Sequence, residues 1–341
     1  MKNTPTIRDV AKAAQVSVAT VSRILNGKPD VSEETRQKVM QTIDGIGYVK
    51  RMQWQQITSG KSRVISLHYP RKLAGQSQVS HDFIIGASAA CEEEGYSLHL
   101  ITQSLEENKL LDLYRTNQSD GVILMEIRID DWRVTLLRQK QLPFVMIGHC
   151  EDNEGMSFID LDFEAAVVAA YDHLVALGHR HISYMPIVVD PGKGQYGPTI
   201  RAAAGYQEAC RKYNLPGYSV EIGTDLTSIE NAVLNLLDRS PETTAIVSLS
   251  DISLVGIFNA IRAKGLKIPD DISAIGLTSD QGAQMITPPP TAIQFPSRTM
   301  GYEAGKMLIN KLEKGSNDVV QNLMKPQLIV RNSSGPARIT S

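Results

Sequence analysis

The sequence has few of the residues and motifs that mark several common protein classes. Its three cysteines, Cys91, Cys150 and Cys210, are widely spaced and form no CxxC pair, so neither a disulfide framework nor a zinc site is expected. It has no run of about 18 apolar residues, which argues against a membrane-spanning helix. The first ten residues, MKNTPTIRDV, lack the apolar segment of a secretory signal. We therefore expect a cytoplasmic location and reduced thiols.

Motifs for catalysis and cofactor binding are also missing. The sequence has no G-x-S-x-G elbow, and DPGKGQYGPT at 190–199 lacks the GxxxxGK[ST] spacing of a phosphate-binding loop. We interpret that segment as a lid over a cleft. His179 and His181 lie two residues apart with no third ligand nearby, so structural roles are favoured over metal binding. No enzyme activity, cofactor or metal is expected.

Length and charge indicate a chain with distinct parts. A chain of 341 residues is long enough for two or three domains. Residues 1–62 contain ten Lys/Arg and five Asp/Glu, whereas the remainder contains 25 Lys/Arg and 32 Asp/Glu. A basic head on an acidic body fits a nucleic-acid-binding module joined to a domain that need not touch polyanions, although an excess this modest can also arise by chance.

The stretch TIRDVAKAAQVSVATVSRILN at 6–26 predicts two short helices joined by a tight turn. Thr6 is placed to cap the first helix, whose apolar face starts at Ile7. Ser17 is placed to cap a second helix that ends near Leu25, and Ser32 a third with the sequence EETRQKVMQTIDGI. Three short helices around a few aliphatic side chains are typical of a helix-turn-helix.

The predicted second helix has two different faces. Val21, Ile24 and Leu25 should pack on the other helices, whereas the opposite face carries Val18, Ala19, Ser22 and Arg23. Such a face fits a major groove about 12 Å wide, where Arg23 can donate two hydrogen bonds to guanine. Candidate phosphate contacts are Ser17, Thr20 and Asn26, and Thr6 is a further candidate DNA contact. The pattern alone also fits a small capping bundle with a solvated outer face.

The ordered string T-I-R-D-V-A…A-x-V-S-x-x-T-V-S-R-I-L-N, followed by VSEETRQKV and by Gly47-Tyr48, resembles the head of the lac repressor/purine repressor (LacI/GalR) family. The resemblance favours DNA binding over the capping bundle and implies a double-stranded DNA operator as partner. It also implies a head at 1–48, a hinge helix at 49–61, and a core at 62–341 that binds an effector and dimerises.

The expected hinge departs from the family pattern. Ile57 stands where the family usually has the Leu that wedges into the minor groove. Lys50 stands where Pro is common, and Trp54 replaces a small Ala. Pro presets a helix-start angle that Lys does not, and an indole takes far more room than a methyl group. We therefore expect a hinge that orders less readily or docks differently.

The remaining sequence predicts an α/β fold. Short aliphatic runs such as RVISLHY and DGVILM alternate with helical segments such as DWRVTLLRQKQ, and the pattern restarts after Asp162. This alternation is typical of parallel sheets covered on both faces. The family resemblance implies a two-lobed periplasmic-binding-protein type I core with doubly wound parallel sheets. Its N lobe would comprise 62–161 and 294–324, and its C lobe 162–293 and 325–334.

Candidate effector contacts follow from the expected strands. In open α/β sheets, ligands bind beyond the carboxyl ends of the strands. The residues just after the strands, together with one Arg near a family contact position, are therefore candidates: His68, Tyr69, His149, Tyr184, Arg201, Asp251, Thr278, Asp280 and Phe295.

Several positions differ from those of sugar-binding members of the family. Ala202 occupies a common Arg position, Ser250-Asp251 replaces Asn-Asp, Leu277-Thr278 replaces Tyr-Asp, and Gly148-His149 stands where several members keep an Asp. These changes remove donors and acceptors that sugar hydroxyls favour. We expect a pocket that holds a small molecule without the commonest sugar contacts.

Together these expectations describe a homodimeric, sequence-specific DNA-binding transcription regulator, with a repressor favoured over an activator. It would read a palindromic operator and respond to a carbohydrate-related small molecule. Control by a protein partner or a corepressor is a second interpretation, kept open by the altered cleft residues. A solute-binding protein fits less well because a secretory signal is lacking, and an enzyme because no convergent catalytic set is visible.

Overall fold

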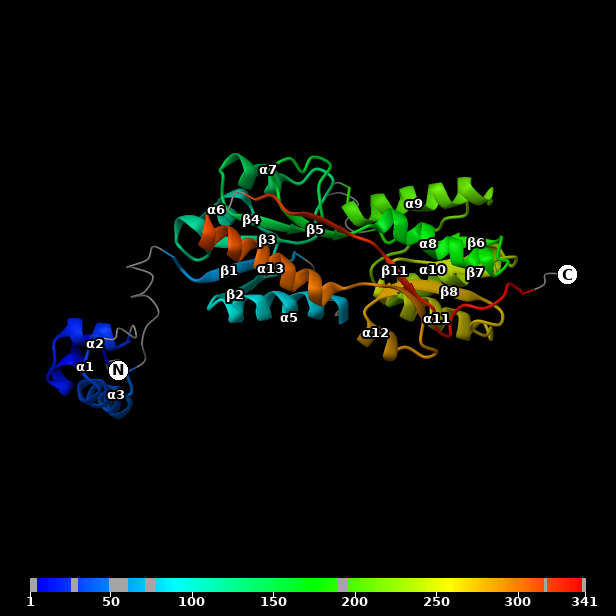
Figure 1. Cartoon of the computed structure of the whole chain (residues 1–341). Coiled ribbons are helices and arrows are strands. Elements are labelled where there is room, and N and C mark those ends of the chain that lie inside the picture. Colours follow the sequence, from blue (N-terminus) through cyan, green and yellow to red (C-terminus); the bar gives the residue numbers. More distant parts are fainter. Residues whose placement is uncertain are drawn as a thin grey trace. The chain divides into compact units, whose positions relative to one another are not determined.

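The computed structural model describes residues 5–25, 30–48, 61–70, 78–188, 195–315 and 318–338. The chain divides into two compact units, Met1–Ser62 and Arg63–Ser341, whose elements are labelled in Figure 1. The candidate DNA contacts Asn26 and Ile57 and the two hinge substitutions Lys50 and Trp54 lie outside the described residues.

The first unit contains the three expected helices: α1 (Ile7–Ala14), α2 (Val18–Leu25) and α3 (Glu33–Ile46). Local capping defines their ends. The Thr6 hydroxyl accepts the Asp9 amide while the Asp9 carboxylate accepts the Thr6 amide, so both partners of a capping box are present. Ser32 caps α3, which ends at Gly47 in the left-handed conformation. The helices surround a small aliphatic core that includes Val10, Val21 and Val39.

The second unit is α/β, as predicted, and contains two sheets. The first has the strand order β10-β5-β4-β3-β1-β2, and every pairing in it is parallel. Its strands are β1 (Val64–His68), β2 (Ser97–Ile101), β3 (Gly121–Leu124), β4 (Phe144–Ile147), β5 (Phe158–Leu161) and β10 (Gln321–Met324).

Helices cover both faces of this sheet: α5 (Gln78–Glu93) and α13 (Ser297–Lys314) on one, α6 (Glu107–Arg115) and α7 (Trp132–Gln139) on the other. Strand residues alternate between the two cores. Ile123 packs with α5 and α13, whereas its neighbours Val122 and Leu124 pack with α6 and α7. Because both faces of the sheet are covered, residues that point to either face are apolar, and the strands appear as continuous apolar runs in the sequence.

The second sheet has the order β11-β9-β8-β7-β6. Its strands are β6 (Ile182–Tyr184), β7 (Ala245–Val247), β8 (Ser273–Thr278), β9 (Thr291–Gln294) and β11 (Gln327–Ile329). The pairings are parallel except at the edge, where β11 runs antiparallel to β9. One core is formed with α8 (Phe163–Ala176) and α9 (Gly197–Tyr213), and the other with α10 (Leu226–Arg239) and α11 (Asp251–Ala263). The short α12 (Asp280–Gln284) follows β8.

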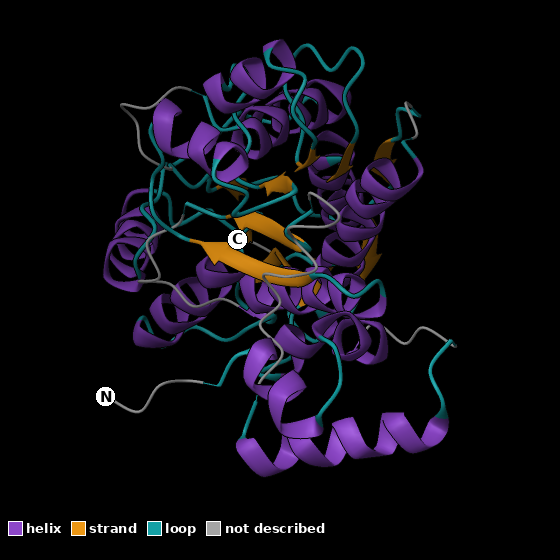
Figure 2. Cartoon of the chain, turned by 90° about the vertical axis from the view of Figure 1, so that its left-hand side faces the viewer, coloured by secondary structure: helices purple, strands orange, loops and turns teal. Residues whose placement is uncertain are grey.

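Figures 1 and 2 show strands in the interior with helices on their flanks, as in a doubly wound architecture. Each sheet and its helices form one lobe, and the chain passes between lobes after β5, after β9 and after β10. Glycines bring α5 and α13 close together. A Cβ added at Gly86 would lie 2.0 Å from the Arg298 carbonyl oxygen, and one at Gly301 would lie 2.2 Å from that of Phe83.

Candidate functional site

The outer face of α2 is exposed because its opposite face packs into the small core. Val21 and Ile24 are buried, whereas Val18, Ala19 and Arg23 are exposed and Ser22 is half-buried. Val18 keeps 40% of its surface accessible. The structure therefore presents the side chains that the sequence pattern assigned to DNA.

The polar side chains at the two ends of α2 make hydrogen bonds and an ion pair within the head. The Ser17 hydroxyl accepts the Thr20 amide at 3.0 Å and lies 2.8 Å from the Thr20 hydroxyl. Arg23 makes an exposed ion pair with Asp30, with 3.6 Å between Nη1 and Oδ2. Such exposed pairs are weak and screened by salt, so the Arg23 guanidinium is available to another acceptor.

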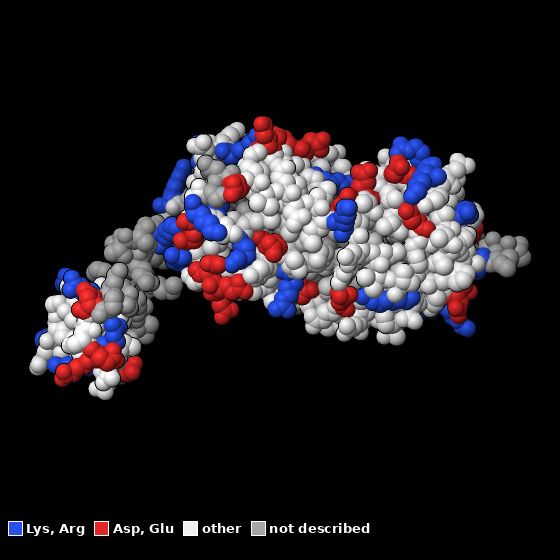
Figure 3. Space-filling view, in the orientation of Figure 1, with Lys and Arg blue, Asp and Glu red and all other residues white. Residues whose placement is uncertain are grey.

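The charge difference between head and body does not produce a surface of one sign on the face shown in Figure 3. Acidic and basic side chains are interspersed there on both units. On this face, the excess of basic residues in the head therefore forms no continuous basic surface.

The second unit contains a cavity between the two lobes, where strands of both sheets end. The apolar and aromatic lining residues include Val79, Phe83, Met125, Ile127, Ile147, Phe163, Tyr184, Pro186, Tyr196, Ala202, Leu249, Leu277, Phe295 and Met300. Polar lining residues include Glu126, Asp160, Thr199, Ser250 and Asp251, and Tyr69 completes the aromatic set. An apolar cleft with a few convergent polar groups is the usual form of a small-molecule site.

Four of the nine candidate effector contacts line this cavity: Tyr69, Tyr184, Asp251 and Phe295. Phe295 lies between the lobes and makes edge contacts with Phe83 of α5 at 5.5 Å and Phe163 of α8 at 5.9 Å between ring centroids. The Tyr69 hydroxyl is 2.8 Å from that of Ser80, so its polar end is engaged inside the protein.

The other five candidates are not among the lining residues. Asp280 bonds Gln294 and Arg331, and Thr278 is buried at the end of β8. His149 holds the lining residue Asp160, with 2.8 Å between Nδ1 and Oδ2, and stacks on Phe158. Arg201 donates to two main-chain carbonyls of the opposite lobe.

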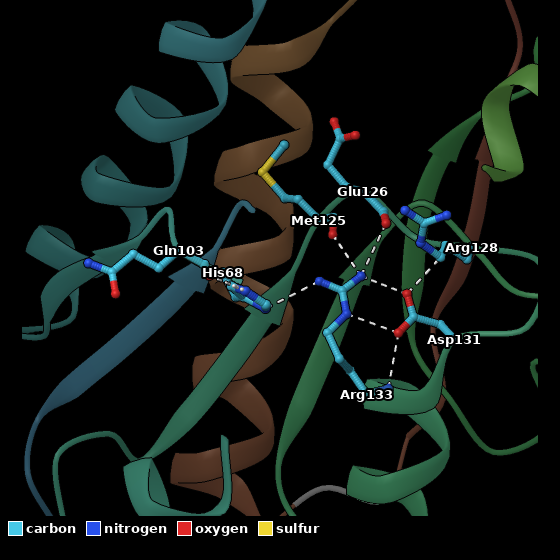
Figure 4. Close-up of polar contacts among 7 residues, drawn as sticks. All are labelled: His68, Gln103, Met125, Glu126, Arg128, Asp131 and Arg133. Carbon is cyan, nitrogen blue, oxygen red and sulfur yellow. Dashed lines mark hydrogen bonds and ion pairs between the residues drawn. The ribbon is translucent and has the colours of Figure 1, made fainter. Parts of the chain in front are cut away.

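The fifth, His68, lies in a buried polar network with Arg133 and Asp131 (Figure 4). Its Nε2 is 3.1 Å from the Gln103 carbonyl, and its Nδ1 is 3.2 Å from Arg133 Nη1. A carbonyl only accepts and a guanidinium only donates, so the ring must be neutral and protonated at Nε2. Burial, followed by the charge of Arg133, lowers the pKa of His68 to about 4.

Arg133 organises this network. Its guanidinium makes two bonds to the buried Asp131 carboxylate, at 2.9 and 2.6 Å, and Nη2 also donates to the carbonyls of Met125 and Glu126. Burial alone would raise the pKa of Asp131, but its hydrogen bonds and the charge of Arg133 outweigh burial, and its pKa lies below the ordinary value. The Asp131 carboxylate of this network therefore stays ionised at neutral pH.

The network shapes the loop after β3, whose residues line the cavity. Glu126 has a φ of 56°, a left-handed conformation that is uncommon for a residue with a side chain. The two bonds from Arg133 to the Met125 and Glu126 carbonyls hold this conformation. Sequence reasoning missed Met125, Glu126 and Ile127, although their place directly after a predicted strand was a usable signal.

The same loop contacts the start of α9 in the other lobe. The Gly197 amide donates to the Ile127 carbonyl at 3.1 Å, and the Ile129 amide donates to the Gln195 carbonyl at 3.0 Å. Tyr196 lies between these bonds and lines the cavity. The part of the 190–199 segment that the structure describes thus borders the cavity at the junction between lobes.

Among the described residues, none of the helices combines the length and the apolar composition of a membrane span. No group of three or more His, Cys, Asp or Glu side chains in these ranges is placed to hold a metal ion.

Comparison with known proteins gives two domain matches. Residues 6–50 match the bacterial regulatory proteins of the lacI family, and residues 171–334 match a periplasmic binding protein-like domain. Catabolite control protein A of Priestia megaterium is 27% identical over 323 residues, which are 92% of this chain and 94% of that protein.

Solved structures agree with this assignment. The complex of the transcriptional regulator CelR with cellobiose has a TM-score of 0.71 and 25% identity, covering 96% of this chain and 99% of that one. The lac repressor dimer bound to operator and the anti-inducer ONPF has a TM-score of 0.85 and 21% identity, covering 98% and 100%. The lacI-type head at 6–50, the periplasmic binding protein-like domain at 171–334 and relatives that align over nearly the whole chain identify a lacI-type DNA-binding transcription regulator.

Proposed function

We propose that this regulator reads DNA through the exposed face of α2, as a homodimer on a palindromic operator in the cytoplasm, and that it acts as a repressor. The observation that carries the proposal is the division of α2 into a buried face and an exposed face of Val18, Ala19 and Arg23. Short side chains allow close approach to base edges, and Arg23 can bond guanine O6 and N7. A two-fold symmetric dimer presents two such helices to two half-sites.

We further propose that a small carbohydrate-related metabolite binds in the cavity between the lobes. The cavity combines aromatic rings with a few polar groups at strand ends, and two of the compared structures contain ligands of small-molecule type: cellobiose with CelR and ONPF with the lac repressor. Because residues of both lobes line it, a ligand can change how tightly the lobes are held together. The protein would act by this change in conformation and without chemistry on the ligand.

The DNA proposal is tested by selecting bound duplexes from a random library with the full-length protein, then measuring affinity for the selected site and for a scrambled one. In the Arg23→Ala variant we expect the preference for the selected site to fall by about 1–3 kcal/mol, which is about fivefold to more than a hundredfold. Lys38→Ala on the exposed side of α3 removes the same charge and should keep the preference. Equal preference in wild type and Arg23→Ala would refute direct readout by this residue.

A further inference from the structure

The cavity between the lobes has an unbalanced set of charges. Its described lining residues include three carboxylates, Glu126, Asp160 and Asp251, but no Lys or Arg side chain. Two of the three follow strands of different lobes: Glu126 lies in the loop after β3, and Asp251 is the first residue of α11, the helix that follows β7. A carboxylate can interact with a ligand only where its oxygens are not already hydrogen-bonded to the protein.

Asp160 is satisfied by the protein itself. Its Oδ2 is 2.8 Å from His149 Nδ1, and its Oδ1 accepts the Leu161 amide at 2.8 Å. Only 2% of its surface is accessible. Asp160 therefore shapes the wall of the cavity and positions His149, and it leaves little acceptor capacity for a ligand.

Arg201 does not supply the missing positive charge at the cavity surface. Its Nη2 donates to the carbonyls of His149 and Cys150, at 2.9 and 3.1 Å. The next residue, Ala202, lines the cavity instead. One residue turns a helix by about 100°, so the Arg lies on a different side of α9 from the position that faces the cavity. Arg201 thus joins the lobes through Nη2, while its Nη1 is buried without a hydrogen-bond partner among the described residues and its charge interacts with Asp160.

Glu126 and Asp251 remain as acceptors. Glu126 Oε1 is 3.4 Å from the Tyr196 hydroxyl, and Asp251 Oδ1 accepts the amide of its neighbour Ile252 at 2.9 Å. Neither carboxylate makes an ion pair with a Lys or Arg of the described chain. Both are half-buried among aromatic and aliphatic side chains, where an unpaired charge interacts more strongly with a ligand than it would in water.

We propose that the effector of this cavity carries no negative charge and presents hydroxyl or protonated amine donors to Glu126 and Asp251. Ionised carboxylates only accept hydrogen bonds, and they pair most strongly with cationic donors. A phosphate or carboxylate on the ligand would face like charges and would find no Lys or Arg among the described lining residues. Glu126 and Asp251 are thus the residues that exclude acidic derivatives. The inference rests on the proposed effector function and specifies its ligand class.

The experiment compares related sugars whose members differ in the charge of one substituent. The full-length protein is titrated calorimetrically with glucose, glucosamine and glucose 6-phosphate, and with galactose, galactosamine and galacturonate, at pH 7.5 and low salt. Maltose and cellobiose extend the neutral series. In whichever set binds, we expect the acidic member to bind at least tenfold more weakly than the neutral one, and the amino sugar to bind at least as tightly as the neutral one.

Variants connect this order to the two carboxylates. Glu126→Gln and Asp251→Asn keep the side-chain size and should each reduce the difference between acidic and neutral members severalfold. Glu107→Gln, on the exposed start of α6, is the matched control and should leave the affinity difference between acidic and neutral members unchanged. An affinity difference that stays at its wild-type size in both cavity variants would refute the assignment of these residues.

The remaining outcomes separate this inference from the proposed function. An acidic member that binds as tightly as its neutral counterpart would overturn the inference while leaving a carbohydrate effector in place. Failure of every set to bind, in protein that still prefers its selected DNA site, would overturn the carbohydrate effector and this inference together. That result would favour control by a protein partner.

Discussion

Lowering the pH should destabilise the core through His68, because this histidine is neutral when folded. Burial and the charge of Arg133 lower its pKa to about 4, against an ordinary value of 6.5. Well above pH 6.5 the ring is neutral in both the folded and the unfolded chain, so it does not make the free energy of unfolding depend on pH. Between pH 6.5 and 4 this histidine is protonated in the unfolded chain and neutral in the folded chain, so the free energy of unfolding decreases as the pH falls.

The size of the effect follows from the two pKa values. At pH 5 an unfolded histidine is almost fully protonated, whereas His68 in the folded protein is about one-tenth protonated. The difference corresponds to a loss of about 2 kcal/mol in the free energy of unfolding between pH 7.5 and pH 5. Because Asp131 has a pKa below its ordinary value, it contributes to this dependence only at lower pH.

Urea unfolding followed by far-ultraviolet circular dichroism at pH 7.5 and 5.0 measures this loss. His68→Gln keeps a donor and an acceptor but removes the titration. Burial also lowers the pKa of His173 and His179, so wild type and variant share that part of the pH dependence. We expect wild type to lose about 2 kcal/mol more than the variant. An equal loss in both proteins would show that His68 titrates normally and would refute the buried network.

Three further predictions concern packing and the junction between lobes. Arg133→Met leaves the Asp131 carboxylate buried without its partner and should destabilise the core by about 3–5 kcal/mol in the same urea assay. A loss of stability below about 1 kcal/mol would contradict this expectation. Gly86→Ala places a Cβ 2.0 Å from a main-chain oxygen of α13 and should lower stability by about 1–3 kcal/mol, and unchanged thermal unfolding would mean that the two helices can separate at little cost. Arg201→Met removes two charge-assisted hydrogen bonds between the lobes and should speed hydrogen exchange of the Gly197 amide about tenfold without affecting the amides of the sheets. An equal acceleration of all amides would instead indicate a general loss of stability.

The head was predictable because its information is local. Thr6, Ser17 and Ser32 satisfy amides within three residues along the chain, and the apolar spacing around Val21 and Val39 needs no distant partner to be recognised. The helix bounds and the exposed face of α2 followed from these signals. The alternation of apolar runs and helices likewise indicated a parallel α/β core, since buried parallel strands read as continuous apolar segments.

The cavity was predictable only in part. The rule that ligands bind after strand ends found Tyr69, Tyr184, Asp251 and Phe295, because a strand end is visible in the sequence. It could not tell which side chains turn inward. His68 ends a strand yet points into a buried network with Arg133.

Sequence by itself determined the family, the three capped helices, the parallel sheets and the strand-end location of the cavity, because each depends on short-range spacing. Tertiary structure alone decided the direction of the polar side chains. Arg201 joins the lobes because one helical residue rotates it away from the cavity, and Glu126 lines the cavity because a buried Arg133 holds its backbone in a left-handed turn. These roles depend on partners about 7 to 52 residues away along the chain, which no local pattern encodes.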